Sequence, residues 1–415
     1  MKKFSRESLS VAVIEWNWVG HHPTYFSHMV LAFEEQGCNV LAICTEPEQA
    51  HKSIEELRQH YNLGPRAKGV SEFRQLILPT QRLTRILRGS IGAIDLTIRR
   101  FRAIEAIAKR WQHESGKTLD LIFYACIYDW DFQWFRYAKP FLSFPWSGLY
   151  LHAWSFRMPG RPHPKTKRLP CPEQIFSGPL CRGVTILDEA VTIRFAAATS
   201  KPVSVMPDMI DCRLPQVAQW PLAQRLKQWA KGRPIVGLFG YLQPSKGMVP
   251  LLLASQDPRL SHVCFAFGGE IEWPLFSSEE RRTICDTLSN GQNTWNHLMQ
   301  IRDGEPMNSL LSSSDILCAS YLDFPHSSNI MTKAALLQKP LIVSDGYLMA
   351  ERVRNFRMGE VIQQGDGEAL VAAILKLTDD SATWIAKTQP RWTDYLHEHS
   401  YERLIQTVRE ILAWT

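Results

Sequence analysis

The sequence predicts an α/β protein with two domains, each a doubly wound parallel sheet covered by helices. Short apolar segments of strand length alternate with longer amphipathic segments along the chain, the pattern of repeated strand–helix–strand units. Several of the short segments are largely or wholly apolar, such as residues 10–14 and 341–343, as expected of strands buried on both faces. The length of 415 residues fits two domains of roughly 200 residues.

The composition is that of an ordinary globular protein, with 45% hydrophobic and 21% charged residues. No apolar run approaches the roughly 18 residues of a membrane helix, and the N-terminal segment has only a strand-length apolar stretch, so we expect no signal peptide. The nine cysteines are scattered and form no Cys-x-x-Cys pair. We therefore predict reduced core thiols in a cytoplasmic protein, with no metal site.

Basic residues gather at residues 82–110, where arginines and lysines are interleaved with leucine and isoleucine. Two interpretations of this segment remain open. It is either a solvated helix face beside the core or a basic amphipathic surface that makes a peripheral contact with the inner face of a membrane. We expect no nucleic-acid partner, because no binding motif accompanies these cations.

The first domain is predicted to open with a strand, a glycine loop and a helix. Gly20, His21 and His22 occupy the loop, and Pro23 suits the first turn of a helix that would reach residue 36. The three-glycine fingerprint of dinucleotide sites is missing, so this Rossmann-like opening does not indicate NAD. Further strands are expected at 38–44, 73–78, 119–124 and 146–151, with helices at 91–113 and 127–137. His152 directly follows the 146–151 strand.

The second domain is predicted to begin with a buried strand at 234–240 that meets Gly240 and Tyr241. Lys246 and Gly247 come next, before a helix that starts near residue 248. A glycine loop, a lysine and a helix N-terminus suit a diphosphate, since each offers N–H donors or positive charge. A strand at 263–267 leads to Gly269, and a short edge strand is expected at 299–302.

Residues 312–353 form the most informative stretch. A buried strand at 315–319 is followed by a loop that holds Asp323, Ser327 and Ser328, and a helix begins at Asn329 with Lys333 on its polar face. A second strand at 341–343 and an Asp-Gly turn complete a parallel crossover. Loops after the strands of such units carry ligands, and the serine-rich turn favours an anion such as phosphate.

Taken together, these motifs resemble the family 4 glycosyltransferases, which have the GT-B fold of two Rossmann-like domains that face a central cleft. The donor-binding segment of that family is matched at Ala334-Ala335, Lys339-Pro340 and Asp345-Gly346, and its Lys-Gly pair at Lys246-Gly247. The chain departs from the family where two glutamates are expected, at Pro325 and Lys333. It also has Tyr241 in place of the arginine that precedes the Lys-Gly pair.

The resemblance implies a retaining, metal-independent hexosyltransferase. The donor substrate would be a nucleotide-diphosphate sugar, with UDP or GDP as the nucleotide, and the acceptor a saccharide, a lipid-linked molecule or a small molecule. No cofactor would be permanently bound. His152 would position the donor sugar and Lys246 would stabilise the departing diphosphate. The other expected site residues are Gly20, His21, His22, Gly240, Tyr241, Gly247, Gly269, Asp323, Ser327, Ser328, Asn329 and Lys333.

The resemblance also implies domain boundaries. Residues 1–211 would form the acceptor-side domain, 212–232 a linker and 233–390 the donor domain, and the helix within 391–415 would pack back on the first domain. Two alternatives stay open because both family glutamates are replaced. The chain could be a GT-B protein that serves as a binding or assembly subunit, or an epimerase-type enzyme with this fold.

Overall fold

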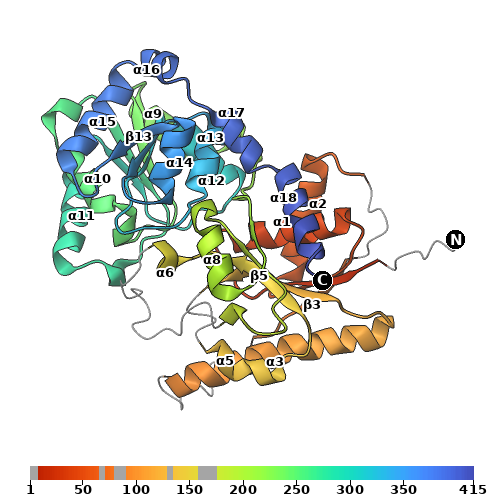
Figure 1. Cartoon of the computed structure of the whole chain (residues 1–415). Helices are drawn as coiled ribbons and strands as arrows, with labels where there is room; N and C mark the ends of the chain where they lie inside the picture. Colours follow the sequence, from red (N-terminus) through yellow and green to blue (C-terminus); the bar gives the residue numbers. More distant parts are fainter. Residues whose placement is uncertain (1–7, 65–70, 79–89, 129–133, 158–174) are drawn as a thin grey trace. The chain divides into compact units, whose positions relative to one another are not determined.

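The computed structural model describes residues 8–64, 71–78, 90–128, 134–157 and 175–415 (Figure 1). By its internal contacts the chain divides into two compact units. The first comprises Met1–Met209 and Ser400–Thr415, and the second Ile210–His399. Each unit contains one parallel sheet with helices on both faces, so the predicted α/β class with two doubly wound parallel sheets is confirmed.

The sheet of the first unit has seven strands in the order β3-β2-β1-β4-β5-β6-β7, and its neighbouring strands pair in parallel. The strands are β1 (Ser10–Glu15), β2 (Asn39–Cys44), β3 (Glu72–Gln75), β4 (Leu121–Ile127), β5 (Trp146–Tyr150), β6 (Val184–Ile186) and β7 (Val203–Val205). The central strand β1 is buried along its whole length, as its apolar sequence predicts.

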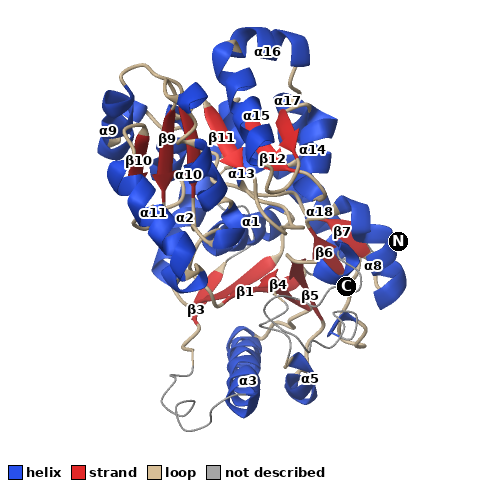
Figure 2. Ribbon diagram, turned by 90° about the vertical axis from the view of Figure 1, so that its left-hand side faces the viewer, coloured by secondary structure: helices blue, strands red, loops and turns tan. Residues whose placement is uncertain are grey.

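Helices cover both faces of this sheet, as Figure 2 shows for α1 and α3. They are α1 (His22–Glu35), α2 (Pro47–His60), α3 (Ser90–Ser115), α5 (Phe135–Ala138), α6 (Trp154–Arg157), α8 (Thr192–Thr199) and α18 (Tyr401–Leu412). One apolar cluster contains Phe26 and Val30 of α1, and the other contains Phe101 and Trp111 of α3. Among the residues placed in the structure, no helix combines the length and apolar character needed to cross a bilayer.

The last helix, α18, is part of the first unit although it comes after the whole second unit in the sequence. It packs against α1 and β7, and the Thr407 hydroxyl donates to the Val205 carbonyl at 3.1 Å. The Tyr401 ring stacks on Tyr61 with centroids 4.3 Å apart. Leu404, which is fully buried, adds to the same apolar cluster as α1, so the C-terminus contributes to the core of this unit.

The second unit has a six-stranded parallel sheet in the order β10-β9-β8-β11-β12-β13. Its strands are β8 (Ile235–Phe239), β9 (Cys264–Gly268), β10 (Thr294–His297), β11 (Ile316–Ala319), β12 (Leu341–Ser344) and β13 (Gly359–Ile362). Its helices are α9 (Pro221–Ala230), α10 (Met248–Ala254), α11 (Ser278–Asn290), α12 (Glu305–Ser313), α13 (Ile330–Leu337), α14 (Leu348–Phe356), α15 (Gly367–Asp379), α16 (Ser381–Thr388) and α17 (Trp392–Glu398).

Two predicted elements are wrong. The strand β4 continues to Ile127, which pairs with Tyr150, so no helix starts at residue 127. Tyr128 and Phe135, two of the aromatic residues that suggested a helix there, pack into the core, and α5 contains the helical part that the structure describes. The edge strand is β10, since Thr294–His297 pair with β9, whereas residues 299–302 are irregular. Only Ile301 of that run packs on the core, and Met299 is exposed.

A buried hydrogen bond fixes α1 to the segment that ends the first unit. The Tyr25 hydroxyl donates to Asp208 Oδ1 at 2.6 Å, and both residues are 2% exposed. Burial, followed by the nearby Asp208 carboxylate, raises the pKa of Tyr25 well above its ordinary value. Hydrogen bonds to charged groups contribute about 1.5–3 kcal/mol.

We expect Tyr25→Phe to lower the free energy of unfolding by about 1.5–3 kcal/mol, because the buried carboxylate loses this donor. Tyr137→Phe is the matched control. Tyr137 is 38% exposed, and removal of its hydroxyl should change the free energy of unfolding by less than about 0.5 kcal/mol. Denaturant unfolding measures both variants. Equal effects of the two substitutions would show that the Tyr25–Asp208 bond does not stabilise the unit.

Candidate functional site

In the second unit, the predicted donor residues follow the carboxyl ends of neighbouring strands. β8 ends before Gly240 and β9 before Gly269, and these two glycines touch. A Cβ added at Gly269 would lie 1.7 Å from the Gly240 carbonyl oxygen, and the φ angle of Gly269 is +133°. Only glycine allows this approach. The absence of a side chain at Gly269 therefore allows the loops after β8 and β9 to lie in contact.

The loop after β8 is also pressed against the end of β11. Gly247 has a φ of +74°, and a Cβ there would lie 2.4 Å from the Ser320 carbonyl oxygen. Lys246 precedes it, with its Nζ 3.9 Å from the centroid of Tyr321 and 4.7 Å from that of Phe324. Such a position holds an ammonium group by cation–π attraction. Tyr241, in the same loop, is 47% exposed.

The turn of Ser327, Ser328 and Asn329 leads into α13, as the sequence predicts. Beneath it lies a guanidinium that the sequence analysis missed. Arg352 of α14 is 2% exposed, and its Nη1 donates to Ser327 Oγ at 2.8 Å and to the Tyr395 hydroxyl at 3.5 Å. A signal was present, because Arg352 falls on the otherwise apolar stripe of its helix, where a charge requires an internal partner. The turn thus has a buried positive charge behind it.

Lys333 and Asp323 have partners inside the second unit. Lys333 is 2% exposed and donates from Nζ to the Asp303 carboxylate and, at 3.0 Å, to Asn308 Oδ1. The amide of Asn308 in turn donates to the backbone carbonyls of Asp211 and Arg213, each at 2.9 Å.

Asp323 occupies the loop between β11 and α13. It has a φ of +45°, in the left-handed region, and its backbone N–H donates to Gln364 Oε1 at 2.7 Å. Gln364 follows β13, so this bond ties the loop before the serine turn to the end of another strand.

In the first unit, the predicted histidines meet around Tyr128. His21 Nε2 lies 2.9 Å from the Tyr128 hydroxyl, and the His152 ring approaches Tyr128 edge-on with centroids 5.0 Å apart. The His22 ring stacks on His21 at 5.2 Å. Gly20, which is exposed, turns the chain into α1 with a φ of +61°. Tyr128 joins these residues, and the sequence analysis did not single it out.

His22 reaches into the interior beneath this cluster. It is 6% exposed, and its Nδ1 lies 3.0 Å from Oε2 of Glu15, the last residue of β1. Its Nε2 lies 3.2 Å from the amide nitrogen of Asn17. The loop between β1 and α1 therefore presents His21 toward Tyr128 and holds His22 against a buried carboxylate.

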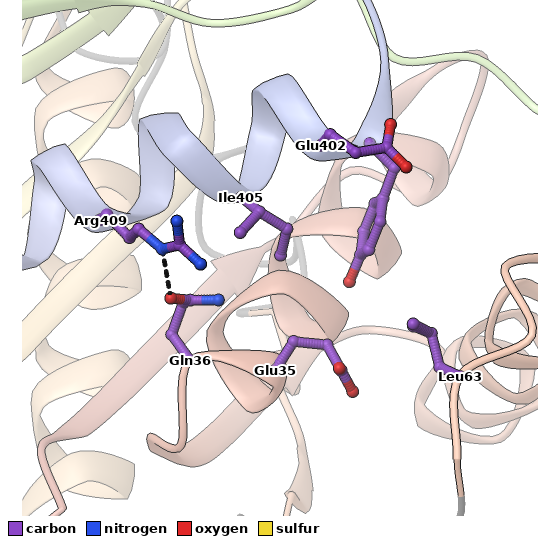
Figure 3. Close-up of a pocket in the computed structure, with 7 residues that line it drawn as sticks. Glu35, Gln36, Leu63, Glu402, Ile405 and Arg409 are labelled. Atoms are coloured by element: carbon purple, nitrogen blue, oxygen red, sulfur yellow. Dashed lines mark hydrogen bonds between the residues drawn. The ribbon is translucent and has the colours of Figure 1, made fainter.

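A surface hollow of about 480 Å³ lies elsewhere on the first unit, between the end of α1 and α18 (Figure 3). Arg409 Nε donates to Gln36 Oε1 at 2.9 Å across it. Its lining consists of Glu35, Gln36, Leu63, Tyr401, Glu402, Ile405 and Arg409. None of the predicted site residues lines it, so it is distinct from both groups of candidate residues.

The fold, with its two parallel sheets, is that of the GT-B glycosyltransferases, and solved structures show the same. The chain is similar to sucrose-phosphate synthase from Thermosynechococcus elongatus, with a TM-score of 0.69, 15% identity, and coverage of 98% of this chain and 100% of that one. It is also similar to HepE of Anabaena in complex with UDP-glucose, with a TM-score of 0.63, 13% identity, and coverage of 98% and 100%.

A glycosyltransferase from Rickettsia africae gives a TM-score of 0.62 at 13% identity, with 97% of each chain covered. No protein-family model and no curated protein sequence matches the chain. At these identities the similarity establishes the GT-B fold and nothing finer.

We expect Gly269→Ala to destabilise the second unit and to separate the loops after β8 and β9, because its Cβ would meet a backbone oxygen that cannot move aside. Overpacking of this kind costs about 1–3 kcal/mol. Gly232→Ala is the control, since Gly232 also has a positive φ, of +81°, but open space around it. Thermal unfolding compares the two, and a loss of stability no larger than that of Gly232→Ala would contradict the close approach.

Proposed function

We propose that this protein is a glycosyltransferase that moves a hexosyl group from a nucleotide-diphosphate sugar to an acceptor, with retention of anomeric configuration and without a metal at the diphosphate. The observation that supports the proposal most directly is the pairing of two cationic elements beyond adjacent strands of the second unit. Lys246 follows β8, and the serine turn backed by Arg352 follows β11, which pairs with β8. The HepE structure, with this fold, contains UDP-glucose.

Lys246 and the turn at Ser327 would act by electrostatic stabilisation. When the bond between the anomeric carbon and the phosphate oxygen breaks, negative charge grows on the diphosphate, and a nearby ammonium group and hydroxyl donors stabilise it. Lys246 and the turn at Ser327 would supply them. The acceptor oxygen forms the new bond to the same face of the sugar, and its proton passes to a phosphate oxygen of the departing group. The donor would be a UDP- or GDP-sugar.

The His21–Tyr128–His152 cluster would serve the sugar and the acceptor. Imidazole and phenol groups offer both donors and acceptors, which suits hydroxyl-rich ligands. The acceptor would be a saccharide, a lipid-linked molecule or a small molecule.

We also propose that the basic segment 82–110 makes a peripheral contact with the inner face of a membrane. Residues 82–89 of this segment lie outside the described part of the chain. In α3, Ile91 is 65% exposed, whereas Arg99 pairs with Asp95, and Arg100 lies 4.7 Å from the centroid of the Trp16 ring. These partners also fit the solvated-face interpretation, in which the cations support the helix.

The second candidate function is a binding or assembly subunit. The internal pairing of Lys333 with Asp303 favours it, because a residue bound within the protein does not contact ribose as the family glutamate does. Binding without turnover would identify such a subunit, and hydrolysis or inversion of the donor without an acceptor would indicate an epimerase-type enzyme. Nucleotide binding and sugar turnover are therefore measured separately.

We expect one of the diphosphates UDP, GDP or ADP to raise the melting temperature of the protein, with the monophosphate CMP as the comparison. A ligand at about 100 times its dissociation constant adds roughly 2.7 kcal/mol of stability. Lys246→Ala should abolish the shift, while Lys387→Ala, which removes an exposed lysine of the same unit, should retain it. A shift that persists in Lys246→Ala excludes Lys246 from the site, and the absence of any shift contradicts a nucleotide-diphosphate donor.

We expect His152→Ala to lower turnover of the nucleotide-sugar identified by that shift by roughly 10²- to 10⁴-fold, as for groups that act on the reacting centre. The nucleotide-diphosphate shift should remain, since His152 lies in the other unit. Sugar transfer and donor hydrolysis are measured by chromatography of the products. Undiminished turnover would exclude His152 from the chemistry.

A further inference from the structure

Three potential metal ligands converge beneath the histidine cluster of the first unit. Glu15 ends β1, His22 begins α1 and Cys126 lies near the end of β4, the strand beside β1. Their exposed fractions are 1%, 6% and 3%. One ligand atom from each residue lies within 4.8 Å of the other two. Three separate elements thus bring an oxygen, a nitrogen and a sulfur to one buried point.

The contact between Glu15 and His22 is not an ordinary hydrogen bond. Oε2 and Nδ1 are 3.0 Å apart, yet both are inaccessible to solvent and neither meets the geometry of a hydrogen bond. Buried polar atoms are almost always hydrogen-bonded, and an unsatisfied carboxylate oxygen is costly. A cation bound by both atoms would satisfy them.

The remaining polar atoms of the two side chains have partners. Glu15 Oε1 accepts from the backbone N–H of Asn17 at 2.8 Å, and His22 Nε2 lies 3.2 Å from the Asn17 side-chain amide. Metal binding through the Nδ1 lone pair requires the ring proton to be on Nε2, so the Asn17 amide, whose nitrogen now faces Nε2, would turn its oxygen toward the ring on binding. Partners of this kind fix the tautomer of metal-bound histidines.

We propose that Glu15, His22 and Cys126 bind a divalent ion of the zinc type. Carboxylate, imidazole and thiolate are each ligands that proteins use for Zn²⁺, and three protein ligands leave a fourth position for water. The thiolate and carboxylate carry two negative charges, which the ion neutralises, so the buried group becomes neutral overall. Bond lengths of about 2.0–2.3 Å place tetrahedral ligands about 3.3–3.8 Å apart. On binding, the Glu15–His22 pair at 3.0 Å would open slightly and any longer separation in the cluster would close.

This site is separate from the residues proposed to hold the diphosphate, although it supports the loop of the proposed His21–Tyr128–His152 cluster. It lies in the first unit, whereas Lys246 and the serine turn, which would hold the diphosphate, lie in the second. The expectation that no metal serves the diphosphate is therefore unaffected, and the proposal departs only from the broader prediction that the chain has no metal site. The ion would join the end of β1, the start of α1 and β4, and so hold the loop that carries His21.

The test is the metal content of the purified full chain after exposure to Zn²⁺ and dialysis. We expect about one equivalent of zinc per chain, and at least a tenfold loss in Cys126→Ser and in His22→Gln. Cys38→Ser is the matched control, because Cys38 is a 2% exposed cysteine of the same unit outside the cluster. Less than about a tenth of an equivalent in the wild-type chain, or full retention in Cys126→Ser, overturns the proposal.

A spectroscopic measurement keeps the test decisive if a variant fails to fold. Replacement of zinc by Co²⁺ in the wild-type chain should give a thiolate-to-cobalt charge-transfer band and the intense visible bands of tetrahedral cobalt. Bound cobalt without the thiolate band overturns the proposal, since the ion then lies elsewhere. Neither readout is catalytic activity, so the outcome is separate from that of the nucleotide experiments.

Discussion

Parallel pairing of the strands is the constraint on which the candidate sites depend. β1 pairs with β2 on one side and β4 on the other, and β8 pairs with β9 and β11 in the same way. β1 and β8 therefore each lie at the point of their sheet where the strand order reverses. The loops that follow two adjacent strands lead away in opposite directions at that point. Glu15 and His22 occupy that position in the first unit, and Gly240 and Lys246 occupy it in the second.

Arg352 and Lys246 of the second unit differ in how easily each could move into contact with a ligand. Arg352 is buried and donates to Ser327, so it acts on a ligand only through the field beneath the turn or through that hydroxyl. Lys246 is held by aromatic rings, whose attraction for an ammonium is about 0.5–2 kcal/mol, a small barrier against the pull of a diphosphate. It is the cation best able to move onto a donor, which is why the proposed transferase depends on it.

Sequence patterns predicted most of the central strands but misplaced the edge strand β10, and they did not predict the long-range contacts of the side chains. The apolar run of β1 and the turn at Lys246-Gly247 after β8 were predicted because strand burial and turn chemistry are local. The pairing of Lys333 with Asp303 could not be foreseen, since 30 residues separate them and only the packing of α13 brings them together. The convergence of Glu15 and Cys126 depends likewise on which strand lies beside β1. Strand order is a property of the whole sheet.

The replacement of a family glutamate by Lys333 has a physical consequence that reaches beyond the missing carboxylate. A lysine buried to this degree requires an anion, and Asp303 supplies it while Asn308 accepts a second hydrogen bond. Since the side chain of Asp303 remains 24% exposed, the pair still presents a carboxylate at the surface of the unit. The substitution therefore exchanges a carboxylate on α13 for one on the neighbouring loop, held in place by the new lysine. A hydroxyl-bearing ligand can find an acceptor there, so the exposed face of Asp303 is compatible with the transferase even though the internal pairing of Lys333 favours the binding subunit.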